Sequence, residues 1–420
     1  KVNQDGVGTT VLTANNDYSG VTTISAGTLQ LGAGGDTGEI KSDVVNNGEL
    51  AFNRRNTLVL DGKISGDGDV SQDGVGTTVL RNNNTYSGST KIWDGTLQLG
   101  DGHASGALLN TTGVDIGEFG ALSFNREDRV VFDKEITGAG KLRQDGAGTT
   151  VLTVDNDNFF GATTISAGTL QLGDGGTSGL IRGDVVNNGT LSFNRLDTMY
   201  IEGKITGSGK VTQDGVGTTV LLANNDYHGG TTINAGTLQL GEYTATGEIT
   251  GDVLNNGELS LFRGNLLTLD GVISGTGKLS QYGCDVAVLT GTNTYSGDTT
   301  ITCGKLQLGD GGDTGTLLNT ARIDNQDELS FKRRNTLVFD RFITGSGKVT
   351  QDGVGTTVLT ANNDYSGGTT INAGVLQLGN GGTTGSIQGD VTNYGALSFN
   401  RSNLLTFGGV ISGSGKVTQD

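Results

Sequence analysis

The chain has 420 residues, with 75 glycines, no proline and a formal net charge of −17. This acidity disfavours nucleic acid or an anionic membrane as a partner. Glycine is abundant without the period of collagen, aromatic residues are only 5%, and good helix formers are sparse, so collagen is excluded and helices are poorly supported. The chain shows no signal peptide, polybasic segment or long apolar run.

The first elements in chain order are short apolar–polar alternations separated by glycine, asparagine or aspartate. They are "KVNQDG" (1–6), "TTVLT" (9–13), "TTISAG" (22–27), "TLQLG" (28–32), "DVVNNG" (43–48), "ELAFNR" (49–54), "TLVLDG" (57–62) and "KISGDG" (63–68). Alternation with period two predicts half-buried strands. The side chains predicted to face inward are Ile24, Leu29, Leu31, Leu50, Phe52, Leu58, Leu60 and Ile64, whereas Gln30 faces outward.

These elements belong to a repeat that fills the chain. The phrase "GTLQLG" stands at 27–32, 95–100, 168–173 and 236–241, with close variants at 304–309 and 374–379. A second marker, the glutamine of "QDG" or its variant, returns about every 69 residues. The units implied are residues 1–68, 69–140, 141–209, 210–277, 278–347 and 348–415, followed by the start of a seventh at 416–420.

Strands of four or five residues within such a period favour a solenoid over a propeller, whose blades are usually about 40 to 50 residues long. We therefore predict an all-β fold, a single-stranded right-handed parallel β-helix continuous over residues 1–420. Coils of about 23 residues give about 18 coils, three per unit. The absence of proline agrees, because every inner coil donates and accepts ladder hydrogen bonds.

Residues 217–241, "GTTVLLANNDYHGGTTINAGTLQLG", and 355–379, "GTTVLTANNDYSGGTTINAGVLQLG", resemble the passenger-associated transport repeat, also called the autotransporter-associated β-strand repeat. Each unit carries one recognisable copy. The resemblance implies a type V secreted passenger, a β-helix displayed on the surface of a Gram-negative bacterium. It also implies membrane attachment through a C-terminal barrel that this sequence lacks. Unit five departs from the pattern, with "GCDVAVL" where other units have "GVGTTVL".

Catalytic motifs are not apparent. The two histidines, His103 and His228, fall at predicted turns, and the recurring aspartates are explained by the repeat itself. We expect no catalytic residue and no cofactor. Asp67, Asp69 and Asp73 have a spacing suited to Ca²⁺, although the turns of other units carry lysine where this one has Asp69, so the candidate is weak.

Two candidate binding features involve arginine. Arg182, Gly183 and Asp184 form an "RGD" attachment motif, in which only the arginine departs from the repeat, so chance substitution is the favoured interpretation. A second arginine recurs once per unit, at Arg54, Arg126, Arg195, Arg263, Arg333 and Arg401. This set predicts an exposed row, either a basic row that contacts anionic glycans or, as the favoured alternative, a solvated row that balances nearby aspartates.

Cys284 and Cys303 lie in the same unit, separated by a little less than one predicted coil. In an oxidising compartment this pair predicts a disulfide, with two buried free thiols as the alternative.

We interpret the chain as a non-enzymatic stalk or adhesive shaft of a bacterial surface protein that mediates adhesion, cell–cell association or biofilm formation. The alternatives are the shaft of a surface enzyme acting on polysaccharide, or a self-assembling extracellular filament. The ligand is a host cell, a glycan or another copy of the chain. The first five residues, Lys1 to Asp5, match the last five, Lys416 to Asp420 in all but one position, so we expect a piece of a longer array whose open ends fray or stack end to end.

Overall fold

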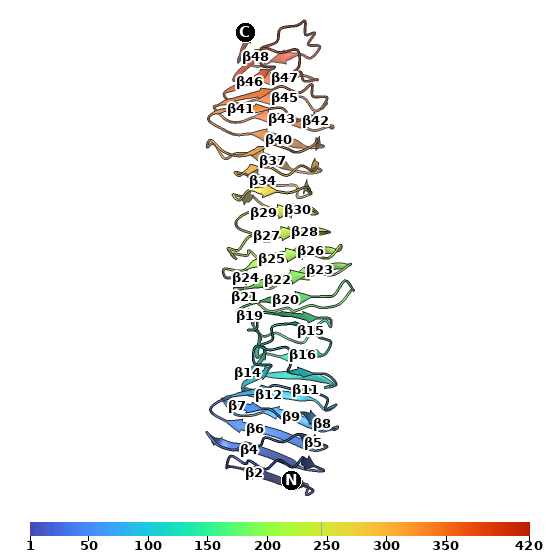
Figure 1. Ribbon diagram of the computed structural model, residues 1–420. Helices are drawn as coiled ribbons and strands as arrows, with labels where there is room; N and C mark the ends of the chain where they lie inside the picture. The colour runs from blue at the N-terminus through green and yellow to red at the C-terminus, as the bar shows by residue number, and fades with distance from the viewer. Residues whose placement is uncertain (245) are drawn as a thin grey trace. The chain divides into compact units, whose positions relative to one another are not determined.

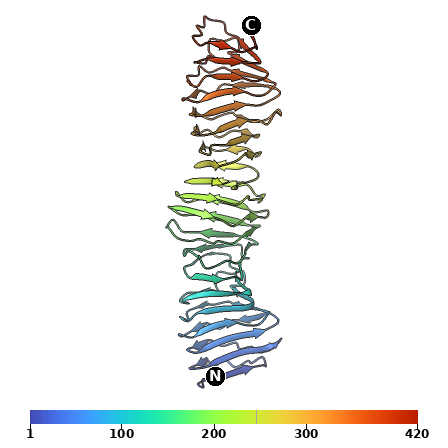
Figure 2. The ribbon, with the colours of Figure 1, turned by 180° about the vertical axis from the view of Figure 1, so that it is seen from behind.

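The structure, a computed structural model, describes residues 1–244 and 246–420, and within them it contains strands and no helix. The fold is a parallel β-solenoid of about 21 turns. It divides into two compact units, residues 1–197 with 201–210 and residues 198–200 with 211–420. In each unit, short strands lie one above another in successive turns (Figure 1), and the view from behind shows the same stacking (Figure 2).

The strands are short throughout. In the first half of the chain they are β1 (Val2–Gln4), β2 (Thr9–Leu12), β3 (Thr22–Ile24), β4 (Thr28–Gly35), β5 (Val44–Asn46), β6 (Glu49–Arg54), β7 (Leu58–Leu60), β8 (Ile64–Ser65), β9 (Asp69–Gln72), β10 (Thr77–Leu80), β11 (Asn83–Asn84), β12 (Thr90–Leu99), β13 (Ala107–Leu108), β14 (Gly113–Phe124), β15 (Arg129–Phe132), β16 (Glu135–Gly138), β17 (Lys141–Gln144), β18 (Thr149–Leu152), β19 (Thr163–Ile165), β20 (Thr169–Leu172), β21 (Val185–Asn187), β22 (Thr190–Phe193), β23 (Thr198–Ile201) and β24 (Ile205–Thr206).

In the second half they are β25 (Lys210–Gln213), β26 (Thr218–Leu221), β27 (Thr231–Ile233), β28 (Thr237–Thr244), β29 (Val253–Asn255), β30 (Glu258–Arg263), β31 (Leu267–Leu269), β32 (Ile273–Ser274), β33 (Lys278–Gln281), β34 (Val286–Leu289), β35 (Thr292–Asn293), β36 (Thr299–Ile301), β37 (Lys305–Leu308), β38 (Thr316–Leu317), β39 (Ile323–Asn325), β40 (Glu328–Phe331), β41 (Thr336–Phe339), β42 (Ile343–Thr344), β43 (Lys348–Gln351), β44 (Thr356–Leu359), β45 (Thr369–Ile371), β46 (Val375–Leu378), β47 (Val391–Asn393), β48 (Ala396–Phe399), β49 (Ile411–Ser412) and β50 (Lys416–Gln419).

One turn of the solenoid contains three strands. Strands β8, β9 and β10 make such a turn, and each pairs in parallel with a strand of the turn before it: β5, β6 and β7. Ser25 donates to Asp5 across neighbouring turns, 20 residues apart in sequence. The predicted coil of about 23 residues is therefore too long, because tight glycine-rich corners shorten the turn, and about 21 turns replace the predicted 18.

The sequence repeat is not a whole number of turns. About 69 residues at about 21 residues per turn correspond to about three and a third turns. Gln72 belongs to the ladder that passes through Ile92, whereas the next copy, Gln144, pairs with Phe124 and so belongs to the ladder of Leu99. Ile92 and Leu99 lie at opposite ends of the long strand β12. Equivalent residues of consecutive repeats therefore lie on different ladders within a compact unit.

The core is built from the apolar residues of the alternating pattern. Each of the eight side chains predicted to face inward in the first unit is at most 1% exposed, and Gln30 between them is partly exposed. The predicted orientation of these strands is therefore confirmed. The tyrosine of the "NDY" or "NTY" phrase is also buried, at Tyr86, Tyr227, Tyr295 and Tyr365, where its hydroxyl meets the threonine four residues later.

The glutamine of the "QDG" phrase stabilises the corner that follows it. The Gln72 side-chain nitrogen donates to the carbonyl oxygen of Gly74 at 2.6 Å and to that of Gly76 at 3.3 Å. The same pair of bonds recurs at Gln144, Gln213 and Gln351. This bonding explains why the phrase returns in every repeat: the buried amide satisfies carbonyl groups that leave the ladder at the corner.

Among the described residues, no helix of sufficient length and apolarity to cross a membrane is present.

Candidate functional site

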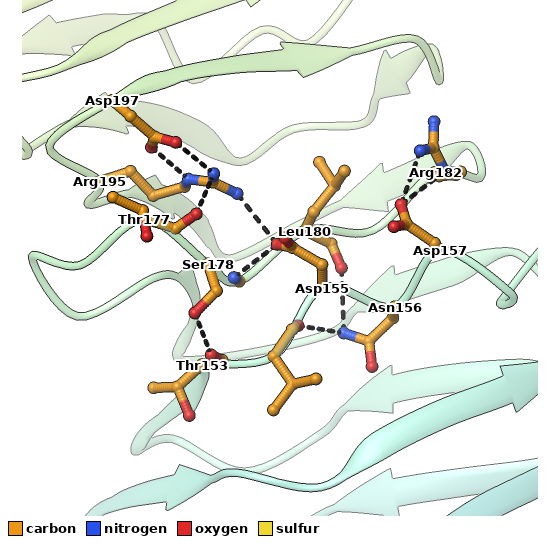
Figure 3. Close-up of polar contacts among 12 residues, drawn as sticks. Thr153, Asp155, Asn156, Asp157, Thr177, Ser178, Leu180, Arg182, Arg195 and Asp197 are labelled. Carbon is orange, nitrogen blue, oxygen red and sulfur yellow. Dashed lines mark hydrogen bonds and ion pairs between the residues drawn. The ribbon is translucent and has the colours of Figure 1, made fainter.

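The segment that follows the Leu–Gln–Leu strand differs in sequence from repeat to repeat, as at residues 32–38, 100–106 and 173–179, and we call it the variable turn. In five repeats the recurring arginine holds this turn from inside. Arg195 follows β22, and its Nε and Nη2 atoms donate to the two carboxylate oxygens of Asp197, each at 2.8 Å (Figure 3). Its Nη1 donates to Asp155 Oδ1 at 3.0 Å, and Nη2 also reaches the carbonyl oxygen of Thr177. The hydrogen bond with Arg195 lowers the pKa of Asp197, and burial only partly opposes this shift. We call this arrangement the arginine clamp.

Similar arginine clamps recur along the chain. Guanidinium groups donate to carbonyl oxygens of the preceding variable turn in five repeats: Arg54 to Asp36 and Gly38, Arg126 to Ala104 and Gly106, Arg195 to Thr177, Arg333 to Asp313 and Gly315, and Arg401 to Thr383 and Gly385. Bonds from a charged donor to a carbonyl are the stronger class of protein hydrogen bond. The arginines therefore fix turns that would otherwise expose unpaired backbone.

The predicted exposed basic row is wrong. The first five of these arginines are only 5–9% exposed, and Arg401 is half-buried. They also lie on different ladders: Phe52, Phe124 and Phe193, each two residues before a clamp arginine, pair with Leu31, Leu99 and Leu172, respectively. The physical reason is the fractional number of turns per repeat, which a linear sequence comparison does not reveal. Glycan contact by these arginines stays a prediction that their burial disfavours.

The "RGD" segment lies at a turn, with its charged groups engaged. Arg182 Nη2 lies 2.6 Å from a carboxylate oxygen of Asp157, and its Nη1 lies 3.5 Å from Glu202 (Figure 3 shows the first pair). Asp184 accepts a hydrogen bond from the backbone nitrogen of Lys204 at 2.8 Å, and Gly183 is half-buried. Cell attachment through this motif stays a prediction, although both charged side chains already have partners within the solenoid.

The candidate calcium residues are not gathered into one site. Asp67 accepts from the Ser87 hydroxyl at 2.9 Å, Asp69 from the Ser89 backbone nitrogen at 2.8 Å, and Asp73 from the Ser71 hydroxyl at 3.4 Å. Each carboxylate thus serves its own inter-turn or local bond. In the described part of the chain, no group of three or more histidine, cysteine, aspartate or glutamate side chains is placed to hold a metal ion.

The two cysteines are joined in the structure. Cys284 and Cys303 form a disulfide with their Cα atoms 4.6 Å apart and a sequence separation of 19 residues. The bridge connects consecutive turns of the solenoid. His103 and His228, predicted to lie at turns, are both exposed.

The described residues also enclose a cavity of about 190 Å³ beside β13 and β15, lined by Leu99, Leu108, Phe124 and Phe132 together with neighbouring residues. Its lining is chiefly apolar, and the titratable side chain in it is that of Asp133. It does not bring together a nucleophile and a base.

One feature that the sequence analysis missed is a cluster of aromatic side chains in the second compact unit. The ring centroids of Tyr243 and Phe262 are 4.2 Å apart, and those of Phe262 and Tyr282 are 6.3 Å apart. We call these three residues the aromatic patch. A comparison of the copies could have marked its members, though not their proximity, because each of the three stands where the other repeats carry a non-aromatic residue.

With this geometry established, comparisons with known proteins identify the repeat. The family model described as the passenger-associated-transport-repeat matches residues 2–31, 70–99, 137–172, 211–240, 286–308 and 349–378. The six matches cover the "QDG" corner or the strand after it and extend to the Leu–Gln–Leu strand in every unit. No solved structure matches the chain significantly.

Three relatives were found. The chain is 31% identical to the adhesin BmaC autotransporter of Brucella suis biovar 1 (strain 1330), over 98% of this chain and 14% of that protein. It is 27% identical to the uncharacterized lipoprotein YdeK of Escherichia coli K12, over 60% of this chain and 21% of YdeK. It is 29% identical to the probable autotransporter YfaL of the same strain, over 69% of this chain and 26% of YfaL. The chain thus spans about a quarter or less of the length of each relative.

Proposed function

Since this chain is an array of passenger-associated-transport repeats, a β-solenoid of the autotransporter passenger type, we propose that it forms the adhesive shaft of a Gram-negative bacterial surface protein. The family implies a passenger exposed at the outer membrane. In the proposed role the solenoid binds a surface ligand directly, on its outer turns, and catalyses no reaction.

The observation that carries the proposal is the similarity to BmaC, a protein named as an adhesin, at 31% identity over 98% of this chain. The similarity runs along the whole solenoid. The shaft itself, rather than a separate head, is therefore the part of this chain that we propose to be adhesive.

The separate roles of inward and outward residues in each turn support the proposal. Leucine, isoleucine and valine fill the interior, while the arginine clamps fix the variable turns by their backbone carbonyls. Side chains at the tips of those turns are consequently free to vary without loss of the fold. Within each compact unit the variable turns lie on different ladders, so they point in different directions around the solenoid and offer several contact surfaces.

The test is attachment of the purified 420-residue chain to surfaces. Latex beads coated with the chain are expected to bind cultured epithelial cells, or one another, more than beads coated with a protein of equal size and charge. Beads that bind no more than this control would contradict the proposal.

The runner-up, a shaft that carries polysaccharide-cleaving activity, has its own readout. The same chain is incubated with a panel of bacterial and host polysaccharides, and new reducing ends are measured. The proposal predicts no release above the rate of buffer alone. Release by the chain that exceeds this background would replace adhesion by an enzymatic function.

A further inference from the structure

The aromatic patch gathers side chains from three consecutive turns. Tyr243 belongs to β28, Phe262 to the paired strand β30, and Tyr282 follows β33, which pairs with β30. Tyr243 is 68% exposed and Tyr282 is 39% exposed, while Phe262 between them is half-buried. The rings are tilted by 57° and 79°, so the patch is corrugated, and its two outer rings face solvent.

All three residues depart from the repeat. The position of Tyr243 is glycine in the other five units, and that of Tyr282 is aspartate at its other six occurrences. The position of Phe262 is occupied by asparagine in four units and by lysine in one, at Asn53, Asn125, Asn194, Lys332 and Asn400. Three departures from the repeat, each to an aromatic residue and separated by about one turn, thus form a single contiguous surface.

The first change introduces backbone strain. Tyr243 has a φ of 55° and is the only non-glycine residue with positive φ in the described part of the chain. Its counterparts Gly34, Gly102, Gly175, Gly311 and Gly381 also have positive φ, which glycine adopts at little cost. A Cβ atom at Gly175 or Gly311 would meet nothing within 4 Å, so the tyrosine enters open space and the strain is in the backbone alone. Retained strain of this kind is typical of functional sites.

The third change removes a hydrogen bond. In other repeats the aspartate at this position accepts from a serine on the neighbouring strand, as Asp145 does from Ser123 and Asp352 from Ser330, both at 2.7 Å. Tyr282 cannot accept in the same way. The hydroxyl of Ser260, the equivalent serine, is buried and makes no hydrogen bond with any residue that the structure describes. A buried polar group without a partner is unfavourable, which is a second local cost of building the patch.

The disulfide lies beside the patch. Cys284 is two residues after Tyr282, and its bond to Cys303 fixes the corner that presents this tyrosine. These are the two cysteines of the sequence, and both lie in the fifth repeat, so the disulfide is also a departure from the repeat. A surface held rigid before binding loses less conformational entropy when a ligand is bound.

Polar groups flank the rings. Glu242 precedes Tyr243 in β28, and its carboxylate accepts a hydrogen bond from the hydroxyl of Tyr200 at 3.4 Å. Together with the tyrosine hydroxyls of the patch, these groups offer donors and acceptors next to exposed aromatic faces. The carboxylate and the net charge of −17 disfavour an anionic ligand.

We propose that Tyr243, Phe262 and Tyr282 form a binding patch for a neutral oligosaccharide. The C–H groups on the faces of a sugar ring pack on the electron-rich faces of Tyr243 and Tyr282, and the sugar hydroxyls bond to Glu242, Tyr200 and the tyrosine hydroxyls. This inference rests on the proposed adhesive function and names the class of ligand for it.

The test is calorimetric titration of the full chain with four neutral hexasaccharides, those of glucose, mannose, galactose and N-acetylglucosamine. At least one is expected to bind. The variants Tyr243→Gly and Tyr282→Asp restore the residue of the other repeats, so each is expected to remain folded and to weaken that binding about tenfold or more. Circular dichroism and thermal unfolding show whether each variant is folded.

The matched control is Phe160→Ser, which replaces an aromatic side chain that is 69% exposed, outside the patch, by the residue that several other repeats carry there. Its affinity is expected to equal that of the parent. Heparin and hexalysine serve as anionic and cationic competitors. Absence of binding to all four hexasaccharides, equal binding by the folded patch variants, or tighter binding of heparin or hexalysine would each overturn the proposal.

Failure of this inference is distinguishable from failure of the adhesive function. If beads coated with the Tyr243→Gly variant attach to cells as the parent does, adhesion stands and the patch is not its site. If the parent chain binds a hexasaccharide but coated beads do not attach, the patch stands and the proposed adhesive function fails.

Discussion

Two turns of the second compact unit, residues 309–315 and the described residues 241–244 and 246–247, occupy the same place in their repeats and differ in what they present to solvent. Each follows a Leu–Gln–Leu strand, and the side chain of a buried arginine, Arg333 or Arg263, lies beside its first glycine, Gly309 or Gly241. The first turn has Gly311 at its tip, with open space beside it, whereas the second has Tyr243 in the aromatic patch.

The comparison shows that the interior residues which hold a turn do not depend on the side chains that the turn exposes. Arg333 donates to the carbonyl oxygen of Gly315 at 3.1 Å, a bond that depends on the backbone and not on the side chains of the turn. The interior therefore tolerates almost any residue at the tip whose backbone adopts the turn. Our proposal therefore assigns ligand binding to outward departures from the repeat, such as Tyr243, rather than to the repeated residues.

Removing a clamp arginine is expected to have the largest effect on the free energy of unfolding. Arg333→Met leaves the carbonyl oxygens of Asp313 and Gly315 without their charged donor and should lower the free energy of unfolding by about 3 kcal/mol. Urea unfolding followed by circular dichroism measures the change. The neighbouring Arg334→Met is the control, because Arg334 is exposed and its guanidinium pairs with the Asp313 carboxylate at the surface, and it should leave the transition unchanged. Equal effects of the two variants would argue against the clamp.

Removing the disulfide beside the patch should have the second-largest effect on stability. The double variant Cys284→Val with Cys303→Ala restores residue types found in other repeats and is expected to lower the free energy of unfolding by about 2 to 3 kcal/mol, since the bond closes a loop of 19 residues. Thermal unfolding with and without reductant checks this. The parent should lose stability on reduction, while the double variant should not respond. A parent that is insensitive to reductant under conditions that free both thiols would contradict the prediction.

Exchanging the tips of the two turns sharpens the comparison with a smaller effect. Gly311 has a φ of 107°, so Gly311→Tyr is expected to cost about 1 to 2 kcal/mol in backbone strain. Tyr243→Gly relieves strain but gives up ring contacts, and its thermal midpoint should stay within about 5 °C of that of the parent. Differential scanning calorimetry distinguishes the two. A Gly311→Tyr variant as stable as the parent would show that the turn is not strained.

The smallest expected effect is on the loss of stability at low pH. Lys305 lies 2.7 Å from Glu328 and 3.0 Å from Asp352, where the fourth repeat has Thr237 in place of the lysine. Burial alone would raise the pKa of Glu328 and of Asp352, but hydrogen bonds from Lys305 and other donors outweigh it, so both pKa values are lowered. A lowered carboxyl pKa stabilises the fold above the unfolded pKa of about 4, and this stabilisation is lost as pH falls through the folded value.

The Lys305→Thr variant should therefore lose less stability than the parent between about pH 5 and pH 2. Urea midpoints measured across this range provide the check, with Lys416→Thr, a change at an exposed lysine, as the control. A parent and a Lys305→Thr variant with the same pH dependence would show that Lys305 does not set these pKa values.

The sequence was sufficient for the parallel solenoid and for its inward residues, because period-two alternation directly reports which side chains are buried. The length of a turn was not predictable, since it depends on how tightly glycine corners such as Gly74–Gly76 close. The error matters, because 23 residues per coil would place Arg54 and Arg126 in one row, whereas the observed turn places them on different ladders.

The burial and the turn contacts of the clamp arginines were also not predictable from the sequence. The clamp arginines donate to backbone carbonyl oxygens of a turn 16 to 22 residues earlier, which the sequence alone does not bring close to them. Their other acceptors include asparagine or aspartate side chains two residues later, such as Asn56 and Asp197. The aromatic patch was also not predictable, because Tyr243, Phe262 and Tyr282 become neighbours only when the turn length is known. Comparison of the repeats marks them as departures, but only the ladder brings them together.

The central claim is that the repeated residues build the fold and that the outward departures from the repeat bind the ligand. The most direct test is the attachment of beads coated with the triple variant Tyr243→Gly, Phe262→Asn and Tyr282→Asp, compared with the parent on the same cells. We predict a folded chain whose attachment falls about tenfold. A folded triple variant that attaches as strongly as the parent would contradict the claim.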